Sequence, residues 1–289
     1  VGLSTKILPH NFIELIDASI AHLRGKKFQV FPDFLTAGSI DVSDYNDGLR
    51  GGKVRIRAKI SQEDKTILKI TEIPFGTTTG SLIDSVLKAN EKGKIKIKKI
   101  EDNTAAEVEI LIHLVPGSSP DKTIDALYAF TDCEISVSPN ACVITDQTPE
   151  FLTVTEILTH NTNNTVKLLK SELEIELDEL QEQWHFSSLE RIFIENRIYH
   201  DIEEEETWEG VISAIDKGLK PYIAHLIRPV TEEDITRLTE IRIKRISKFD
   251  LDKAQQYIES LEEKIENVKH HLANLIDFAV EYLKNIKTK

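Results

Sequence analysis

The chain has 289 residues, of which 40% are hydrophobic and 29% charged, so it can build one large core or two ordinary ones. No stretch reaches the ~18 uncharged apolar residues of a membrane span, and no basic region ahead of an apolar run suggests a signal peptide. Because the chain contains no Met and begins with Val in what reads as a loop, we expect an excised segment of a longer protein.

The net charge of −13 is unevenly distributed along the chain. Residues 1–100 contain 17 Lys and Arg and 11 Asp and Glu, which gives +6, whereas residues 101–289 carry −19. An acidic surface repels a polyanion, so any nucleic-acid surface is expected in the first third of the chain.

Residues 1–150 predict a mixed α+β domain, because stretches of helical period alternate with stretches of period two. The expected elements are a helix from Phe12 to Leu23 stopped by Gly25, a strand Lys53–Ile60 paired with Thr66–Ile73, a helix capped by Thr79 or Ser81 and running to Ala89, strands Lys94–Ile100 and Val108–Leu114, a helix from Asp121 to Tyr128, and a strand pair Ile135–Val137 and Ala141–Thr145.

Two of these strands have a basic face. On the first strand, apolar residues alternate with Lys53, Arg55, Arg57 and Lys59, which would contact DNA phosphates without reading sequence. A solvated outer face is the alternative. Lys94, Lys96 and Lys98 form a similar stripe with the same two interpretations.

Residues 151–289 predict long helices. Leucines from Leu169 to Leu180 recur every three or four residues, and so do the apolar residues from Leu251 to Ala279, as in a coiled-coil seam. The second run would form one helix of roughly 36 residues, about 54 Å long. The simplest closure is an antiparallel helical pair that carries a small helical tip at about residues 203–250.

Other patterns favour structural roles. Cys133 and Cys142 are expected to be reduced thiols, and no Cys/His spacing resembles a zinc site. The segment Gly76–Ser81 lacks the ending of a phosphate-binding loop and is expected to be a turn with a helix cap. The carboxylates Glu203–Glu206 are expected to form a solvated turn, because four consecutive side chains point in different directions.

Six segments, in order along the chain, form the most specific pattern in the sequence. They are VGLSTKILPHN (Val1–Asn11), PDFLTAG (Pro32–Gly38), GGKVRIRA (Gly51–Ala58), ITEIPF (Ile70–Phe75), the residues Leu127, Tyr128, Thr131 and Ser138–Asn140, and IRIKRISKF (Ile241–Phe249). Together they resemble the A subunits of bacterial type IIA DNA topoisomerases, the family of DNA gyrase and topoisomerase IV. Leu8, Leu35 and Ala37 depart from the family pattern and leave the choice between the two enzymes open; we favour topoisomerase IV.

The resemblance implies a layout in which residues 1–150 are the tower domain and residues 151–289 are the coiled-coil arm with its dimerising tip. The winged-helix domain with the catalytic tyrosine would precede Val1, because none of the six tyrosines here follows an arginine. We therefore expect no catalytic residue in this chain, and the chain alone would not cut DNA.

The resemblance also implies DNA contacts. In the family, the isoleucine at the position of Ile7 wedges between base pairs and bends the duplex, whereas the alternative is a loop anchor in the core. Ser4, Thr5 and Lys6 would hold phosphates beside it. His10 would either contact a phosphate or cap the turn at Asn11.

The last motif implies the exit gate through which DNA leaves. We expect a homodimer closed by two-fold contact of the tips, with the interface formed by Ile241, Arg242, Ile243, Ile246 and Phe249.

The implied enzyme is an ATP-dependent type II DNA topoisomerase in the bacterial cytoplasm, associated with the nucleoid. Mg²⁺ and ATP would be bound by a partner B subunit, and this chain would hold neither metal nor cofactor. The rival hypothesis is a non-enzymatic coiled-coil scaffold, which explains the helical periodicity and acidity but not the ordered motifs before residue 75. An arginine–tyrosine motif encoded upstream of Val1 would decide for the topoisomerase.

Overall fold

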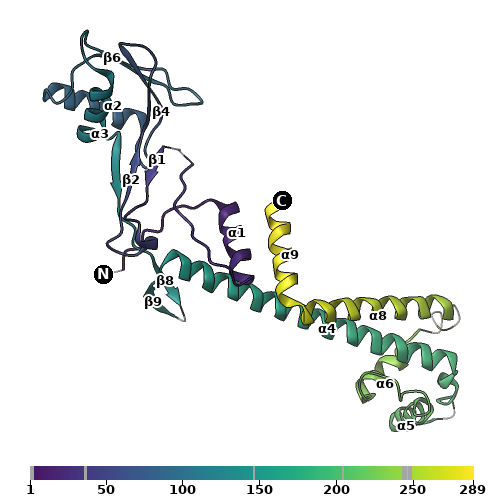
Figure 1. Cartoon of the computed structure of the whole chain (residues 1–289). Helices are drawn as coiled ribbons and strands as arrows, with labels where there is room; N and C mark the ends of the chain where they lie inside the picture. The colour runs from purple at the N-terminus through teal and green to yellow at the C-terminus, as the bar shows by residue number, and fades with distance from the viewer. Residues whose placement is uncertain (1–2, 36–37, 146, 204, 243–245, 247–248) are drawn as a thin grey trace. The chain divides into compact units, whose positions relative to one another are not determined.

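The computed structural model describes residues 3–35, 38–145, 147–203, 205–242, 246 and 249–289 (Figure 1). The α+β class is confirmed, since antiparallel sheets and long helices make up the structure. The chain divides into two compact units, Val1–Asn163 with Leu283–Lys289 (unit 1) and Asn164–Tyr282 (unit 2). The domain boundary expected at residue 150 stays a prediction.

The first helix, α1 (Phe12–Leu23), forms where the sequence predicts it. Asn11 caps it, because its side chain accepts hydrogen bonds from the backbone N–H groups of Ile13 and Glu14. The helix ends before Gly25, whose φ of +67° is rarely adopted by residues with a Cβ atom.

Unit 1 contains two larger sheets and a hairpin. Their strands are β1 (Ser39–Asp41), β2 (Val54–Arg57) and β7 (Glu134–Val137) in the order β1-β2-β7; β3 (Lys59–Gln62), β4 (Ile67–Glu72), β5 (Ile97–Asp102) and β6 (Ile110–Leu114) in the order β3-β4-β6-β5; and β8 (Cys142–Thr145) with β9 (Thr148–Phe151). A short 3₁₀ helix, η1 (Asn46–Gly48), precedes β2.

The prediction of one strand from Lys53 to Ile60 is wrong. The segment forms β2 and β3, which belong to different sheets, and the expected partner β4 pairs with β3 and not with β2. The change occurs at Ala58, whose backbone N–H donates to Cys133 O (2.8 Å) and whose carbonyl accepts from the Tyr128 hydroxyl (2.9 Å). Both backbone groups of Ala58 are therefore already bonded, to Cys133 and to Tyr128. They are not available to pair with β4, so the strand is interrupted at this residue.

The expected strand pair Ile135–Val137 with Ala141–Thr145 is also wrong. β7 pairs with β2, and β8 pairs with β9, with Cys142 opposite Phe151. The segment between β7 and β8 is not a hairpin turn, because the backbone of Asn140 pairs with that of Lys6.

The four-stranded sheet shares its core with the helices α2 (Thr79–Glu91) and α3 (Pro120–Phe130). Leu82 and Val86 of α2 and Leu127 of α3 are fully buried in one cluster with residues of this sheet. The residue that caps α2 is Thr78, with Ser81 completing a capping box, and Ser119 rather than Asp121 occupies the N-cap position of α3.

Unit 2 contains the expected antiparallel helical pair, formed by part of α4 (Val154–Glu195) and most of α8 (Leu251–Ala273). Trp184 Nε1 of α4 donates to Glu262 of α8 (2.9 Å), and Arg191 of α4 donates to Gln255 of α8. From the first contact to the second, the residue number rises by seven on α4 and falls by seven on α8. The two helices therefore run in opposite directions, with Leu173, Leu180, Leu261 and Ile265 among the buried residues of their seam.

The prediction of one unbroken terminal helix is wrong, because α8 ends before Asn274 and α9 (Leu275–Thr288) begins after it. The Asn274 side chain donates to the carbonyl of His270 (2.9 Å), as does its backbone N–H (3.0 Å). Asn side chains compete with helical hydrogen bonds in this way, and Asn274 has non-helical angles (φ −118°, ψ 43°).

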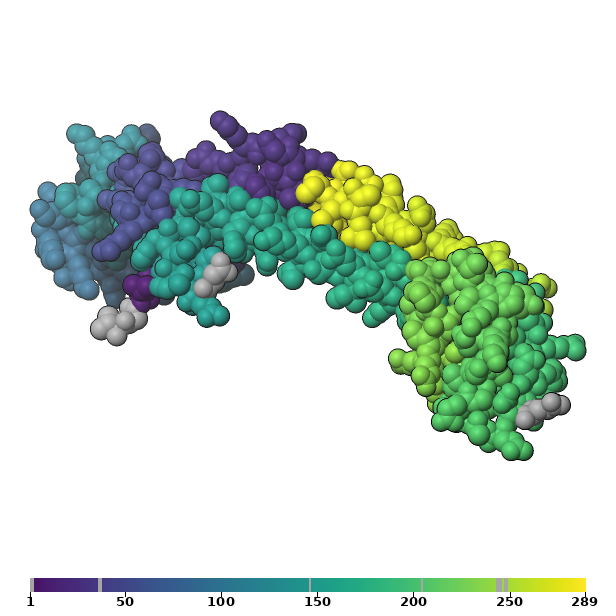
Figure 2. All heavy atoms as spheres, turned by 90° about the horizontal axis from the view of Figure 1, so that it is seen from below, coloured from purple at the N-terminus to yellow at the C-terminus, as the bar shows by residue number. Residues whose placement is uncertain are grey.

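The tip contains η2 (Ile198–His200), α5 (Trp208–Leu219) and α6 (Glu232–Thr239), and Figure 2 shows its green atoms gathered into one body. Ile215, Leu219 and Leu238 are buried there with Leu189 and Phe193 at the end of α4, so the tip has a core of its own. Among the described residues, no helix combines the length and the apolar character that crossing a membrane requires.

The helical pair should depend on the seam of α4 and α8. Leu261 is 1% exposed, so Leu261→Ala should lower the free energy of unfolding of unit 2 by about 2–5 kcal/mol through lost burial and a residual cavity. Urea denaturation followed by circular dichroism measures this. Leu168→Ala, at a 63% exposed position of α4, is the control and should change stability by less than about 0.5 kcal/mol. Equal losses in both variants would contradict the seam.

Candidate nucleic-acid interface

The N-terminal segment is held along the connection between β7 and β8. Lys6 N donates to Asn140 O (2.8 Å), and Asn140 N donates to Lys6 O (2.9 Å). The Asn140 side-chain amide donates to Ser4 O (2.6 Å), and the Thr5 hydroxyl accepts from Cys142 N (3.2 Å). All three of Ser4, Thr5 and Lys6 remain exposed, so this pairing leaves the side chain of Lys6 available to a phosphate.

The next two residues have opposite environments. Leu8 is 4% exposed and belongs to a core cluster with Tyr45, Val54 and Ile56, whereas Ile7 is 48% exposed and belongs to no buried cluster. Leu8 is the residue that anchors this loop in the core, so the structure gives less support to the alternative in which Ile7 is the anchor. An exposed isoleucine beside a fixed backbone is the arrangement that an intercalating wedge needs, and the wedge itself stays a prediction.

His10 is bound within its own loop. Nδ1 lies 2.8 Å from Leu8 O and Nε2 lies 3.2 Å from the Tyr45 hydroxyl. Burial lowers the pKa of His10, so a neutral ring that donates from Nδ1 and accepts at Nε2 fits both contacts. The helix cap belongs to Asn11, and a phosphate contact by His10 remains a prediction that would need one of these bonds to open.

Most cations of the predicted basic face have carboxylate partners. Arg55 pairs with Asp41 (3.0 Å), Arg57 Nε with Glu134 (2.5 Å), and Lys59 Nζ with Glu72 (3.0 Å). The Arg57 guanidinium also lies 4.9 Å from the centroid of the Tyr128 ring. A phosphate would have to compete with these carboxylates, so DNA contact through Arg55 and Arg57 stays a prediction.

Sequence reasoning could not detect this pairing, since the carboxylates lie on other strands. Lys53 differs, because its side chain is exposed and has no carboxylate within 4.0 Å among the described residues. The same holds for Lys94, Lys96 and Lys98, whose charges are therefore more available than those of the arginines.

The residues expected at the dimer interface lie at the tip. Ile241, Ile246 and Phe249 are half-buried against the tip's own core, and Arg242 is exposed. Ile243 lies outside the described residues. The half-buried isoleucines leave apolar surface for a second copy, and the interface stays a prediction.

A charged cluster that the sequence did not indicate holds the tip to α4. Arg228 bonds Glu182 (2.8 Å) and Asp234 (2.6 Å), and Arg237 bonds Glu182 (2.9 Å). His185, 1% exposed, places Nε2 3.5 Å from Asp234, which is also 1% exposed. Buried charges of this kind are stable only when paired, so loss of one partner would destabilise the tip.

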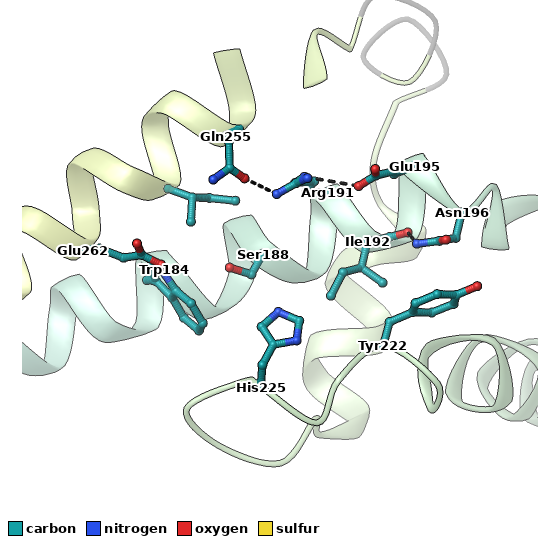
Figure 3. Close-up of a pocket in the computed structure, with 11 residues that line it drawn as sticks. Trp184, Ser188, Arg191, Ile192, Glu195, Asn196, Tyr222, His225, Gln255 and Glu262 are labelled. Atoms are coloured by element: carbon teal, nitrogen blue, oxygen red, sulfur yellow. Dashed lines mark hydrogen bonds and ion pairs between the residues drawn. The ribbon is translucent and has the colours of Figure 1, made fainter. Parts of the chain in front are cut away.

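A hollow of about 560 Å³ lies beside the helical pair in unit 2. Figure 3 shows His225 between Trp184 and Tyr222, and Arg191 directed toward Gln255 and Glu195. Ser188 also lines it, but no hydrogen bond joins Ser188 to His225 in the described parts of the chain. The hollow therefore presents no nucleophile–base pair.

Across the residues that the structure describes, no group of three or more His, Cys, Asp or Glu side chains could hold a metal ion. Cys133 and Cys142 are both free thiols, as expected, and burial raises the pKa of Cys133 to about 11. A thiol with a raised pKa is a poor nucleophile, which fits a structural role for Cys133.

Comparison with known proteins agrees with the motifs. The family model of the DNA gyrase/topoisomerase IV A subunits matches residues 1–284. The A subunit of DNA topoisomerase 4 from Borreliella burgdorferi is 35% identical over all of this chain and 46% of its own length. The A subunit of DNA gyrase from Lawsonia intracellularis is 25% identical over 92% of this chain and 34% of its own, and the A subunit of DNA topoisomerase 4 from Staphylococcus aureus is 24% identical over all of this chain and 38% of its own.

The chain belongs to the family of DNA gyrase/topoisomerase IV A subunits, which confirms the resemblance. It spans between about a third and about half of the length of these relatives.

The tip should lose stability in acid. Burial, with help from the Arg228 charge, lowers the pKa of His185, so the unfolded chain binds its proton more readily. The neutral His185 ring therefore contributes its full share to the stability of the tip above about pH 6.5, the ordinary pKa of histidine. This share decreases as the pH falls below that value. Bonds to Arg228 and Thr231 hold the pKa of Asp234 below its usual range, so its contribution declines only in stronger acid, below about pH 4.

Urea midpoints of unit 2 at pH 7.5 and pH 5.0 measure this effect. The midpoint should fall in the wild-type chain and fall less in His185→Gln, which cannot titrate. His10→Gln is the matched control, because its ring lies in unit 1 and should leave the change in unit 2 unaltered. Identical pH dependence in wild type and His185→Gln would refute the assignment to His185.

Proposed function

We propose that this chain supplies the DNA-bending wedge, the DNA platform and the exit gate of an ATP-dependent type II DNA topoisomerase. The observation that carries the proposal is the outward position of Ile7 beside the buried Leu8, within a segment that carries the family motif. An exposed apolar side chain on a fixed loop can enter a base step, and a bent duplex then contacts more protein.

The DNA platform is proposed for unit 1. The phosphate contacts are assigned to Ser4, Thr5 and Lys6, with Lys53 on the neighbouring strand end. Lysine charges of this kind fix position on the duplex without reading its sequence. Arg55 and Arg57 would join them only when their carboxylate partners exchange.

The exit gate is proposed for the tip and its helical pair. Two copies of the chain would meet through Ile241, Ile246 and Phe249, around a two-fold axis, and separate to release the transported duplex. Helical pairs are suited to this work, because they transmit displacement over their length without a large core. Ile243 and Arg242 are proposed for the same surface.

The partners follow from the same proposal. A B subunit would hydrolyse ATP and hold the catalytic Mg²⁺, and the tyrosine that cuts DNA would lie in another part of the same polypeptide, outside this chain. The chain alone would then bind DNA and dimerise without cleaving. The enzyme would act in the cytoplasm, on the nucleoid.

Topoisomerase IV is favoured over gyrase. The relative from Borreliella burgdorferi is 35% identical over the whole chain, against 25% for the gyrase relative from Lawsonia intracellularis. The scaffold hypothesis loses its support with the family membership, since it rested on the helical periodicity and the acidity alone.

The wedge is tested by Ile7→Ala in the complete protein. A duplex labelled at both ends should show an at least about tenfold smaller ratio of bent to straight DNA, equivalent to about 1.4 kcal/mol, by fluorescence energy transfer. Leu3→Ala, at a 61% exposed position of the same segment, is the control and should bend DNA normally. Normal bending by Ile7→Ala would remove the basis of the proposal.

The gate is tested by light scattering at micromolar concentration. Wild type should have twice the 32.8 kDa mass of the chain. The variant Ile241→Ser/Ile246→Ser should raise the dimer dissociation constant at least about tenfold, through loss of apolar burial. Ile227→Ser, at a 50% exposed isoleucine of the tip, is the control for general surface effects. A wild-type monomer would contradict the gate, and circular dichroism establishes that the variants remain folded.

A further inference from the structure

Five lysines gather where α2 ends and β5 begins. They are Lys88, Lys92, Lys94, Lys96 and Lys98, called the lysine strip below, and all five are exposed. Glu91 is the only acidic residue between them, so residues 88–98 carry a net charge of +4 in a chain of −13. A local charge opposite in sign to the whole chain marks a surface for a polyanion.

The local fold explains why these charges share one surface. Lys94 N donates to Ala89 O (3.0 Å), which turns the chain at the end of α2, and Ile95 and Ile97 are buried in the core of the four-stranded sheet. Lys94, Lys96 and Lys98 are exposed, whereas Ile95 and Ile97 between them are buried, so the three lysines lie on the side turned away from that core.

The charges of the strip are not neutralised within the described residues. No carboxylate lies within 4.0 Å of any of the five ammonium groups there, whereas the neighbouring Lys99 pairs with Glu101 and Lys69 pairs with Glu109 (2.6 Å). Lys94 Nζ lies 5.4 Å from the centroid of the Phe130 ring, a contact that orients the ammonium group and leaves its charge intact.

Lysines on an edge strand also discourage pairing with another sheet, and β5 is an edge strand. That role accounts for Lys98, which lies in β5, and for Lys96 just before it. It does not account for Lys88 and Lys92, which lie on the last turn of α2 and just beyond it, outside the edge. The strip therefore extends further than protection of the edge requires.

We infer that the lysine strip is a second contact for duplex DNA, which holds the phosphates of an arm that extends beyond the segment bent at Ile7. The inference rests on the proposed function and adds a site to it. Ile7 follows Lys6, which pairs with Asn140 just before β8, and Figure 1 shows α2 and its sheet apart from β8 and β9 within unit 1, so a short duplex at Ile7 would not occupy both sites. Lysine ammonium groups suit this task, because they bind phosphate as point charges without base readout.

The test is the salt dependence of DNA binding by the complete protein carrying Lys94→Ala/Lys96→Ala/Lys98→Ala. Each lost phosphate contact should reduce the slope of log affinity against log salt by about 0.9, or about 2.7 for three. Between 50 and 200 mM salt, wild type should then lose about 40 times more affinity than the variant. Fluorescence anisotropy measures both.

The matched control is Lys217→Ala/Lys264→Ala/Lys269→Ala, which removes the same charge from exposed helix positions of unit 2. It should keep the wild-type slope, and so should the variant with arginines at positions 94, 96 and 98. The difference should appear with a duplex of about 60 base pairs and vanish with one of about 20, which spans the bend alone.

The outcomes separate this site from the proposed function. If wild type binds and bends DNA while the strip variant matches the control on the long duplex, the strip is not a DNA contact. If the variant loses affinity only for a poly-glutamate peptide, its occupant is an acidic protein and the inference is overturned. If wild type binds no duplex at all, the proposed function fails and the strip fails with it.

Discussion

The candidate DNA-contacting segment of unit 1 depends on the antiparallel backbone pairing of Lys6 with Asn140. This one bridge joins the N-terminal segment to the connection between β7 and β8, and it places Leu8 in the core and Ile7 in solvent. Lys6 is held by two backbone hydrogen bonds and Leu8 by its burial, and Ile7 lies exposed between these two held residues. The candidate wedge is thus a consequence of pairing over 134 positions along the chain.

Charge pairing decides which cations are free to meet a polyanion. The arginines of β2 are the obvious candidates by residue type, yet each has a carboxylate from another strand. The lysines at the end of α2 and the start of β5 keep their charge unpaired within the described residues. An acidic chain can bind DNA in this way. At about 0.1 M salt, charges more than about 10 Å from a phosphate are largely screened, so the nearby lysines affect binding more than the net charge of the chain does.

The tip obeys a different constraint, the burial of charge. Asp234 caps α6 and also receives Arg228, so one carboxylate satisfies both a helix end and an ion pair. Glu182 of α4 accepts from Arg228 and Arg237, so the same cluster joins α6 to α4. A gate that must close repeatedly in the same geometry would benefit from a tip held in this manner.

The sequence by itself determined the α+β class, the position of α1, the antiparallel helical pair and the family. These follow from short-range periodicity, in which residues three, four or two positions apart share a face, and from ordered motifs. Only the tertiary structure decided that residues 53–60 divide between two sheets, that β8 pairs with β9, that Asn274 interrupts the last helix, and that Arg55 and Arg57 are neutralised. For residues 53–60 and for the two arginines the deciding partner lies far away in sequence, where no local pattern reaches. The partner of β8 is local, since β9 follows it directly in the chain, and the partner of Asn274, His270, is four residues away. At Asn274 the apolar pattern favours a continuing helix, whereas the hydrogen bond of the Asn274 side chain favours a break. The packing of the fold decides between these two conformations.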